Sequence, residues 1–172
     1  MPGKRRTARE MALQMLYQSD LGGSSLPQIF SSFDVTEYLF PGWDEEESKS
    51  EAAGEPRRNR PRGSRRRLQQ VHEAFEYART LVEGTLEHRE EIDRLIRDQA
   101  DNWRLERMPA VDRNILRLAV FEMLHQRDVP KLVVVDEAIE LAKRFGSEQS
   151  GRFVNGLLDG LLKQHTFPGK LQ

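Results

Sequence analysis

The segment from Ile115 to Leu124 constrains the fold of this chain more than any other, because its side chains are apolar on almost every side of a helix. Only Arg117 and Glu122 interrupt the apolar surface. A helix that is hydrophobic all round has to be enclosed by other elements, since a surface helix has one apolar stripe and one polar face. Pro109 suits the first turn of such a helix, where its missing N–H needs no partner. The sequence therefore predicts a central, covered helix.

The N-terminal part of the chain also has helical spacing. Thr7-Ala8-Arg9-Glu10 has the S/T-x-x-E form, in which the hydroxyl and the carboxylate each accept a hydrogen bond from an N–H of a first turn. We therefore expect a helix to begin at Thr7 and to end near Gly22-Gly23, because glycine favours helix C-termini. Its core-facing stripe comprises Ala8, Met11, Ala12, Met15 and Leu16.

The middle of the chain predicts three more helices. A short helix is indicated by Leu26, Ile29, Phe30 and Phe33, and the aromatic stretch after it, with Tyr38, Leu39, Phe40 and Trp43, is assigned to no element. Further on, a long amphipathic run predicts two consecutive helices. The first has Val71, Phe75, Ala78, Leu81, Val82 and Leu86 on one face, and the second has Ile92, Leu95 and Ile96.

The C-terminal part completes an all-α assignment. Val133-Val134-Val135 alone resembles a strand, but apolar residues continue at helical spacing from Val135 to Phe145, and Gly146 suits the position after a helix end. Ser147 is the expected N-cap of a last helix. That helix carries Phe153, Val154, Leu157, Leu158, Leu161 and Leu162. No β-hairpin, βαβ pattern or fixed-period repeat is present in the sequence, so we predict about seven helices and no sheet.

The net charge of −1 conceals strong segregation of charge along the chain. Residues 44–55 contain six acids and one Lys, and residues 57–67 contain seven Arg and no acid. The whole stretch 44–67 lacks Leu, Ile, Val, Met and aromatic residues, so it cannot bury enough apolar surface to offset the entropy of ordering. We expect residues 1–172 to form one helical domain in which 44–67 is a disordered insertion.

Composition and motifs exclude several function classes. The chain has no Cys, no membrane-length apolar run and no secretory signal pattern, which favours the cytoplasm. Its four His lack the spacing of metal-binding motifs, and neither a nucleophile elbow nor a phosphate-binding glycine loop is present. Asp136, Glu137 and Glu140 lie close along one helix, but we interpret them as charges that complement the helix dipole, with Glu140 pairing with Arg144. We expect no enzyme activity, no cofactor and no metal.

The N-terminal bases are the strongest functional signal in the composition. Lys4, Arg5, Arg6 and Arg9 place positive charge at a helix N-terminus, where the helix dipole disfavours it. A phosphate backbone is a natural counterpart, because Arg side chains and free N–H groups of a first turn both bind phosphate. The alternative is a flexible basic terminus that only aids solubility. Tyr17 and Phe153 offer faces on which unstacked bases can lie, although an aromatic residue in such a position is more often part of the core.

Three segments of the chain resemble the NusB family of bacterial transcription antitermination factors. They are RRTAREMALQMLYQSDL (residues 5–21), NWRLERMPAVDRNILRLAVFEML (102–124) and DVPKLVVVDEAIELAKRFGSEQSGRFVNGLLDGLL (128–162), with a looser match through 68–101. The resemblance implies an all-helical fold of two three-helix-like subdomains and no catalysis. It also implies binding to the single-stranded boxA element of nascent ribosomal RNA, together with the ribosomal small-subunit protein NusE. RNA polymerase, an indirect partner, would then resist termination.

Carried over by position, the resemblance assigns two surfaces. The RNA-binding residues would be Lys4, Arg5, Arg6, Arg9, Tyr17, Gln149, Arg152 and Phe153. The protein partner would meet the helix around Asp112, Arg113, Arg117 and Glu122. Two features depart from the family pattern. The insertion 44–67 is extra, and Gln149 replaces a residue that is often acidic, which removes a charge that would repel phosphate.

Alternatives to this function remain at the level of sequence. A NusB-like module also occurs at the N-terminus of some ribosomal RNA cytosine methyltransferases, although this chain has no cofactor-binding motif for such an enzyme. A helical protein-interaction adaptor without RNA binding would use the partner helix and leave the Arg cluster incidental. The sequence also leaves open a homodimer, which would cover part of the RNA surface.

Overall fold

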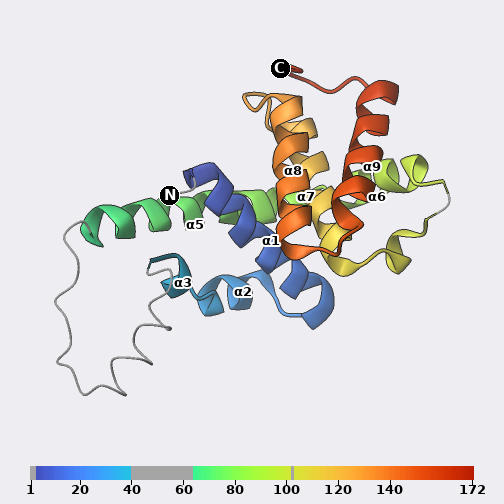
Figure 1. Cartoon of the computed structure of the whole chain (residues 1–172). Coiled ribbons are helices and arrows are strands. Elements are labelled where there is room, and N and C mark those ends of the chain that lie inside the picture. Colours follow the sequence, from blue (N-terminus) through green and yellow to red (C-terminus); the bar gives the residue numbers. More distant parts are fainter. Residues whose placement is uncertain (1–2, 40–63, 102) are drawn as a thin grey trace.

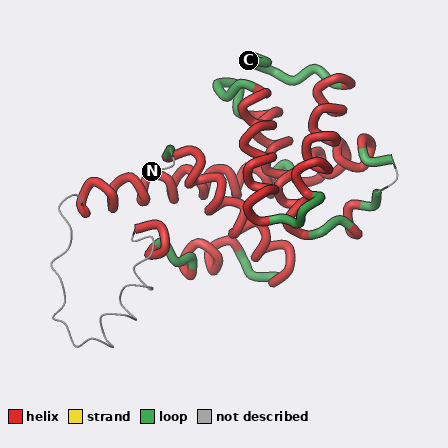
Figure 2. Tube along the Cα trace, in the orientation of Figure 1, coloured by secondary structure: helices red, strands yellow, loops and turns green. Residues whose placement is uncertain are grey.

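The computed structural model describes residues 3–39, 64–101 and 103–172, with the side chain of Ser64 left out, and the chain in these ranges is helical (Figures 1 and 2). No strand occurs in these ranges. The α-helices are α1 (Lys4–Gly22), α2 (Leu26–Ser32), α3 (Thr36–Leu39), α5 (Ser64–Glu87), α6 (Arg89–Gln99), α7 (Ala110–His125), α8 (Lys131–Phe145) and α9 (Ser150–Gln164). A single 3-10 turn, η1, spans Leu105–Arg107. The predicted all-α class is confirmed.

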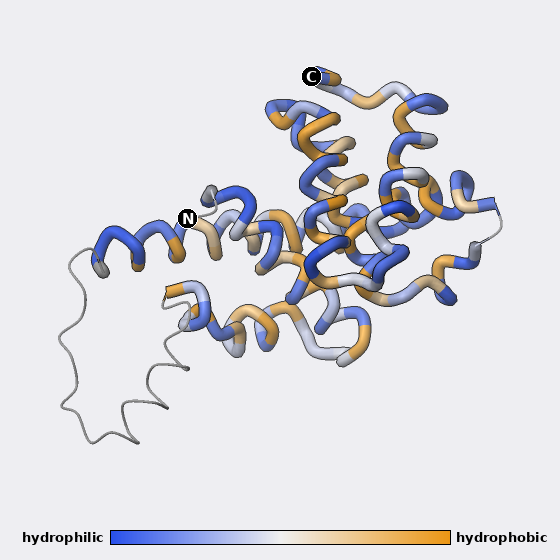
Figure 3. The backbone as a smooth tube through the Cα atoms, in the orientation of Figure 1, coloured by the Kyte–Doolittle hydropathy of each residue, from blue (hydrophilic) through white to orange (hydrophobic). Residues whose placement is uncertain are grey.

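Helix α7 lies at the centre of the molecule, as its all-round apolar sequence predicts. It packs against α1, α5, α6, α8 and α9 (Figure 1). Every residue of α7 from Asn114 to Met123 is buried. Figure 3 colours the same backbone by hydropathy, and hydrophobic and hydrophilic residues alternate along the helices. No helix in the described ranges is long and apolar enough to cross a membrane.

Helix α1 begins one turn earlier than the sequence indicated. Gly3 is the N-cap, and the Thr7 N–H donates to the Gly3 carbonyl at 3.1 Å, so Thr7 lies inside the helix and is buried. Glu10 does not close a capping box, because its carboxylate pairs with Arg144 of α8. The predicted end is confirmed: Gly23 has φ +63°, a left-handed conformation that glycine adopts without a steric penalty.

Helices α2 and α3 cover one side of α1 and α5. The predicted short helix is α2, whose N-terminus is closed by a capping box between Ser25 and Gln28. In α3 the hydroxyl of Tyr38 accepts a hydrogen bond from Gln14 at 2.8 Å, and burial raises the pKa of Tyr38. Phe40, Trp43 and residues 44–63 of the expected insertion lie outside the described residues. Residues 64–67, the end of that stretch, form the first turn of α5 instead.

Helices α8 and α9 form an antiparallel pair against α7. Val133-Val134-Val135 is helical, as predicted. A helix-terminating glycine is expected to be left-handed, but Gly146 has φ −92°. A Cβ at this position would lie 2.5 Å from the Ser150 side chain. Ser147 is not the N-cap of α9. Its N–H donates to the Ser150 hydroxyl at 2.9 Å within a turn, and the helix begins only at Ser150.

Candidate nucleic-acid interface

The first turn of α1 presents three basic side chains that are each about half exposed. Lys4 pairs with Glu73 of α5 at 3.0 Å, and Arg5 pairs with Asp128 of the α7–α8 connection at 3.1 Å. Arg6 donates two hydrogen bonds, at 3.0 and 2.8 Å, to Glu137 of α8. Exposed ion pairs of this kind contribute about 0 to 1 kcal/mol each, so a stronger anion can displace the carboxylates. We name Lys4, Arg5 and Arg6 the N-terminal basic cluster.

These carboxylates help to explain how the structure accommodates bases at a helix N-terminus. Bases at a helix N-terminus are opposed by the helix dipole, and the structure offsets that cost with carboxylates from other segments. The hydrogen bond from Lys4 holds the pKa of Glu73 below its usual value, and that from Arg6 does the same to the pKa of Glu137. The charge of the N-terminal basic cluster is therefore neutralised by ion pairs within the molecule, and these pairs lie at the surface.

Arg9 does not belong to this surface, which corrects its assignment as a phosphate-binding residue. It lies one turn further along α1 and is buried against Glu122 of α7, to which it donates hydrogen bonds at 2.8 to 3.0 Å. The two side chains are 5% and 2% exposed. Its helical position turns Arg9 inward toward the central helix, so phosphate cannot reach it without opening the packing of α1 on α7.

The other predicted RNA-binding residues lie at or near the surface. Tyr17 on α1 is 41% exposed, and Gln149 and Arg152 at the start of α9 are exposed. Phe153 is intermediate: its ring packs edge-on against Trp103 at 5.7 Å between centroids. It is thus neither a fully buried core residue nor a free surface ring.

Trp103 is the aromatic residue that sequence reasoning missed. It lies just before η1, and 57% of it is exposed, with Phe153 packed against it. A large aromatic side chain exposed to this extent is a common platform for stacking of nucleic-acid bases. The signal was present in the sequence as N-W-R-L, but nothing in its periodicity distinguished an exposed Trp from a buried one.

A shallow concavity of about 580 Å³ lies where α8 meets α9, beside Gln149. Its lining residues are Ile139, Lys143, Gly146, Ser147, Glu148, Gly151, Arg152 and Asn155. Lys143 and Arg152 bring positive charge to it, Glu148 brings one negative charge, and the Ser and Asn side chains bring neutral hydrogen-bonding groups. Such a lining suits the phosphate and polar edges of a nucleotide.

Two carboxylates of α8, Glu137 and Glu140, serve as ion-pair partners, whereas the predicted role of Asp136 and Glu137 as charges in the first turn is wrong, because that turn has no acidic residue. Glu137 holds Arg6, and Glu140 lies 3.5 Å from Lys143. Arg144 pairs with Glu10 of α1 rather than with Glu140. Side chains of α1 and α8 reach each other at two points, Arg6 to Glu137 and Arg144 to Glu10.

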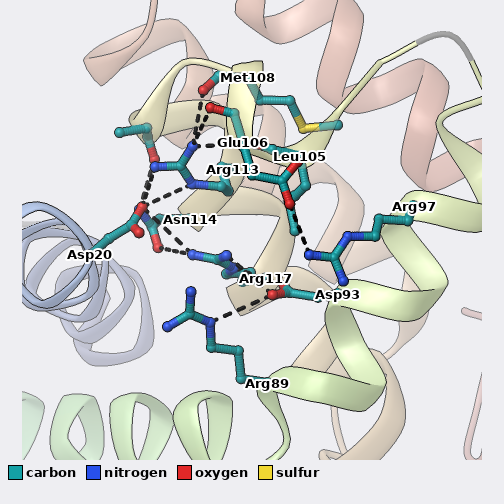
Figure 4. A network of polar contacts seen from close by, with 11 residues as sticks. Asp20, Arg89, Asp93, Arg97, Leu105, Glu106, Met108, Arg113, Asn114 and Arg117 are labelled. Carbon is teal, nitrogen blue, oxygen red and sulfur yellow. Dashed lines mark hydrogen bonds and ion pairs between the residues drawn. The ribbon is translucent and has the colours of Figure 1, made fainter.

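Most polar residues of α7 hold helices together, which corrects their assignment as a partner-binding face; Asp112 is buried, and its Oδ1 accepts no hydrogen bond from the described residues. Arg117 donates to Asp93 of α6 at 2.8 and 3.2 Å (Figure 4). Arg113 donates to Asp20 of α1 at 2.9 Å and also to the carbonyls of Leu105 and Met108, both at 3.2 Å. Asn114 donates to the same Asp20 carboxylate at 3.0 Å.

No side chain of the predicted partner-binding set is free to dock a protein. Asp112, Arg117 and Glu122 are buried, and the Arg113 side chain is 11% exposed and engaged with α1 and η1. The reason is the position of α7 at the centre of the bundle, where covering helices surround even its polar residues. The interpretation of Arg117 as a residue paired to a carboxylate of a neighbouring helix is confirmed.

The structure is a helical bundle with a basic helix terminus and, elsewhere on its surface, exposed aromatic side chains. A model of the NusB family matches residues 6–163, and the chain belongs to that family. The transcription antitermination protein NusB of Symbiobacterium thermophilum is 43% identical over 159 residues, covering 92% of this chain and 89% of that protein. The structure of T. maritima NusB is 35% identical, with a TM-score of 0.67, covering 96% and 93% of the two chains.

A further solved structure contains antitermination factors NusB and NusE in complex with dsRNA. Its matching chain is 26% identical, with a TM-score of 0.64, and the match covers 94% of this chain and 98% of that one. The relatives are named for transcription antitermination and not for a catalytic activity. Because the match spans about nine-tenths of these relatives, they are not modules of a much longer methyltransferase.

Proposed function

We propose that this protein is a transcription antitermination factor that binds single-stranded, boxA-like RNA in nascent ribosomal transcripts in the cytoplasm. The observation that carries the proposal is the N-terminal basic cluster, whose three cations are exposed and held only by surface ion pairs. The NusB family membership supplies the class of function. The relative solved with NusE and dsRNA supports RNA as the ligand.

RNA binding proceeds by exchange of anions at the N-terminal basic cluster. Phosphates replace Glu73, Asp128 and Glu137 as partners of Lys4, Arg5 and Arg6. The exchange is favoured because each bound phosphate also releases counterions from the RNA, which a carboxylate partner does not. Arg9 contributes indirectly, because its buried bond to Glu122 fixes α1 and therefore the position of the cluster.

Exposed aromatic and polar side chains supply a preference for single strands. Tyr17 and Trp103 present faces to solvent, and bases in a single strand can turn out to stack on such faces. Gln149 and Arg152 at the start of α9 offer hydrogen bonds to base edges and phosphate. Bases in a duplex stay paired, so a duplex can contact the basic side chains but its bases cannot stack on the aromatic rings.

NusE is the proposed protein partner, and RNA polymerase is reached only indirectly through the assembled complex. The relative solved with NusE supports this partner. The polar side chains of α7 do not form the docking surface in this proposal, because Arg113, Arg117 and Glu122 are paired with other helices and Asp112 is buried. Partner binding and RNA binding are expected to enhance each other, since both act on one assembly.

A binding experiment with three RNAs tests the proposal. Fluorescence anisotropy compares a single-stranded boxA-like RNA, the same sequence as a duplex, and a single-stranded RNA of scrambled sequence, each with and without purified NusE. We expect the boxA-like single strand to bind most tightly and NusE to tighten binding further. Equal affinity for all three RNAs would reduce the protein to a nonspecific polyanion binder. Absence of RNA binding with intact NusE binding would favour a protein adaptor.

A further inference from the structure

We propose that His88, Glu91 and His125 form a binding site for a divalent transition-metal ion of the zinc class. The three side chains come from two helix junctions that are distant in sequence. His88 connects α5 to α6, Glu91 lies in the first turn of α6, and His125 is the last residue of α7. Motif spacing does not reveal the group, because one of its imidazoles comes from a different helix.

The distances are close to those of a coordination site. The Glu91 carboxylate oxygen Oε2 lies 3.9 Å from His88 Nδ1 and 3.8 Å from His125 Nε2. All three ligand atoms lie within 4.8 Å of one another. Zinc–ligand bonds of about 2.0 to 2.1 Å place tetrahedral ligand atoms about 3.4 Å apart. The two pairs that include Glu91 must therefore close by about half an ångström, and one imidazole ring must rotate to bring the two His nitrogens together.

A buried aromatic ring orients the two imidazoles. Phe121, one turn before His125 on α7, lies 6.2 Å from the His88 ring and 5.4 Å from the His125 ring, measured between centroids. The two imidazoles stack on each other at 3.9 Å with an interplanar angle of 24°. Because Phe121 is almost completely buried, it is a fixed neighbour of both rings. The lone pairs of two stacked imidazoles lie in separate, nearly parallel planes, so metal binding requires at least one imidazole to rotate out of the stack.

The electrostatic surroundings favour a cation. Helix α7 ends at His125, and α5 ends at Glu87, immediately before His88. Both helices thus direct their negative dipole ends to the site, against one positive end from α6. Arg89, the nearest base in sequence, lies 3.5 Å from Asp93 instead of at the site. The ligand side chains are 33 to 52% exposed, so an ion can enter from solvent and complete its coordination with water.

The donor set matches the chemistry of the ion. Two imidazoles and one carboxylate are a common ligand set for zinc, and the same donors bind Co²⁺ and Ni²⁺. The chain contains no Cys, so thiolates do not compete for the ion. Of the residues that the structure describes, these three are the group of His and acidic side chains whose ligand atoms converge in this way. A bound ion would tie the α5–α6 junction to the end of α7.

Calorimetric titration of the full chain with ZnCl₂, together with thermal unfolding, tests the site independently of RNA binding. We expect saturable binding of one Zn²⁺ per chain and a rise in melting temperature. Co²⁺ should produce visible absorption typical of nitrogen and oxygen ligands. The double variant His88→Gln/His125→Gln should lose at least tenfold in affinity and lose the rise in melting temperature. Glu91→Gln should weaken binding on its own.

The matched control is His72→Gln/His165→Gln, which removes two exposed imidazoles elsewhere. It should bind Zn²⁺ as the parent does, and circular dichroism should show both double variants to be helical. Equal Zn²⁺ affinity in the parent and the His88→Gln/His125→Gln variant would overturn the proposal and point to other ligands, such as the acidic stretch of residues 44–55. Failure of the parent to bind Zn²⁺ at micromolar concentration would overturn it as well.

Discussion

Arg9 of α1 and Glu122 of α7 form a buried ion pair in which the guanidinium donates hydrogen bonds of 2.8 to 3.0 Å to the carboxylate. Burial raises the pKa of the Glu122 carboxyl, and the hydrogen bonds from Arg9 oppose that rise. Arg9 itself remains charged, because its interaction with Glu122 outweighs the effect of burial and raises its pKa. The bases in the first turns of α1 therefore have two roles. Those of the N-terminal basic cluster are exposed and can bind an anion, whereas Arg9 is buried and fixes the helix.

Arg9→Met should therefore reduce folding stability rather than act on RNA directly. Removing one partner leaves an uncompensated buried charge, which costs about 3 to 5 kcal/mol in the free energy of unfolding. The double variant Arg9→Met/Glu122→Leu should recover a large part of that loss, because no charge is left unpaired. Urea unfolding measures the loss of stability in Arg9→Met and its recovery in the double variant. Arg6→Met is the exposed control and should leave the free energy of unfolding nearly unchanged. An equal loss in Arg9→Met and Arg6→Met would contradict the structural role assigned to Arg9.

Asp20 should make stability depend on pH in the acid range. Partial burial opposes its ionisation, but hydrogen bonds from Arg113 and Asn114 outweigh that effect and lower its pKa. A carboxylate with a lowered folded-state pKa contributes stability above its ordinary pKa of about 4, and this contribution is lost as pH falls through the folded-state value.

Asp20→Asn tests this linkage. The variant should be less stable than the parent at pH 7, and the difference in free energy of unfolding should shrink as pH falls below about 4. Urea unfolding between pH 7 and pH 3 provides the measurement. A difference that stays constant over this range would show that the Asp20 carboxylate does not contribute through its charge.

Glu137→Gln should strengthen RNA binding. Its carboxylate competes with phosphate for Arg6, and the neutral amide is a weaker competitor. Since an exposed pair of this kind contributes about 1 kcal/mol or less, the gain in affinity should be up to about fivefold. Asp159→Asn on α9, which removes a carboxylate paired only with Lys163, is the control and should change little. Unchanged or weaker binding in Glu137→Gln would mean that Arg6 does not meet phosphate.

Trp103→Ala should weaken binding of single-stranded RNA by about 1 to 3 kcal/mol, because it removes a stacking platform. Its effect on stability should be small, since more than half of the residue is exposed. Phe153→Ala should act partly through Trp103, so the double variant should lose less affinity than the sum of the single variants. Anisotropy measures the RNA affinity of the three variants, and thermal unfolding measures their stability. Parental RNA affinity in Trp103→Ala would show that Trp103 does not belong to the RNA-binding site.

Patterns that depend on local spacing were predictable from the sequence. The central position of α7 follows from its all-round apolar surface, and the end of α1 follows from Gly23. The assignment of Val133–Val135 to a helix also follows from spacing, because the apolar stripe continues to Phe145. Helix starts were less predictable. Thr7 and Ser147 have residue types typical of caps, but the backbone bond to Gly3 and the hydroxyl of Ser150 determine the actual boundaries.

Interactions between distant segments account for what the sequence did not reveal. Arg6 and Arg9 are the same residue type on the same helix. Only the packing of α1 on α7 leaves Arg6 exposed and buries Arg9. The packing of several helices around α7 likewise buries Asp112 and Arg117, although both are charged. Arg144 pairs with Glu10 of α1, although Glu140 lies one turn earlier on its own helix. Such choices depend on three-dimensional proximity, for which a single sequence contains no direct signal.

The most direct test of the proposed function is the salt dependence of RNA binding by the variant Lys4→Ala/Arg5→Ala/Arg6→Ala, which leaves Arg9 in place. Anisotropy titrations with a single-stranded boxA-like RNA at several KCl concentrations give the slope of log K against log salt. We predict weaker binding and a slope that is shallower by about 0.7 for each phosphate that the variant no longer binds, or about 2 for three phosphates, with an unchanged melting temperature. A slope equal to that of the parent would contradict the central claim that the N-terminal basic cluster binds phosphate.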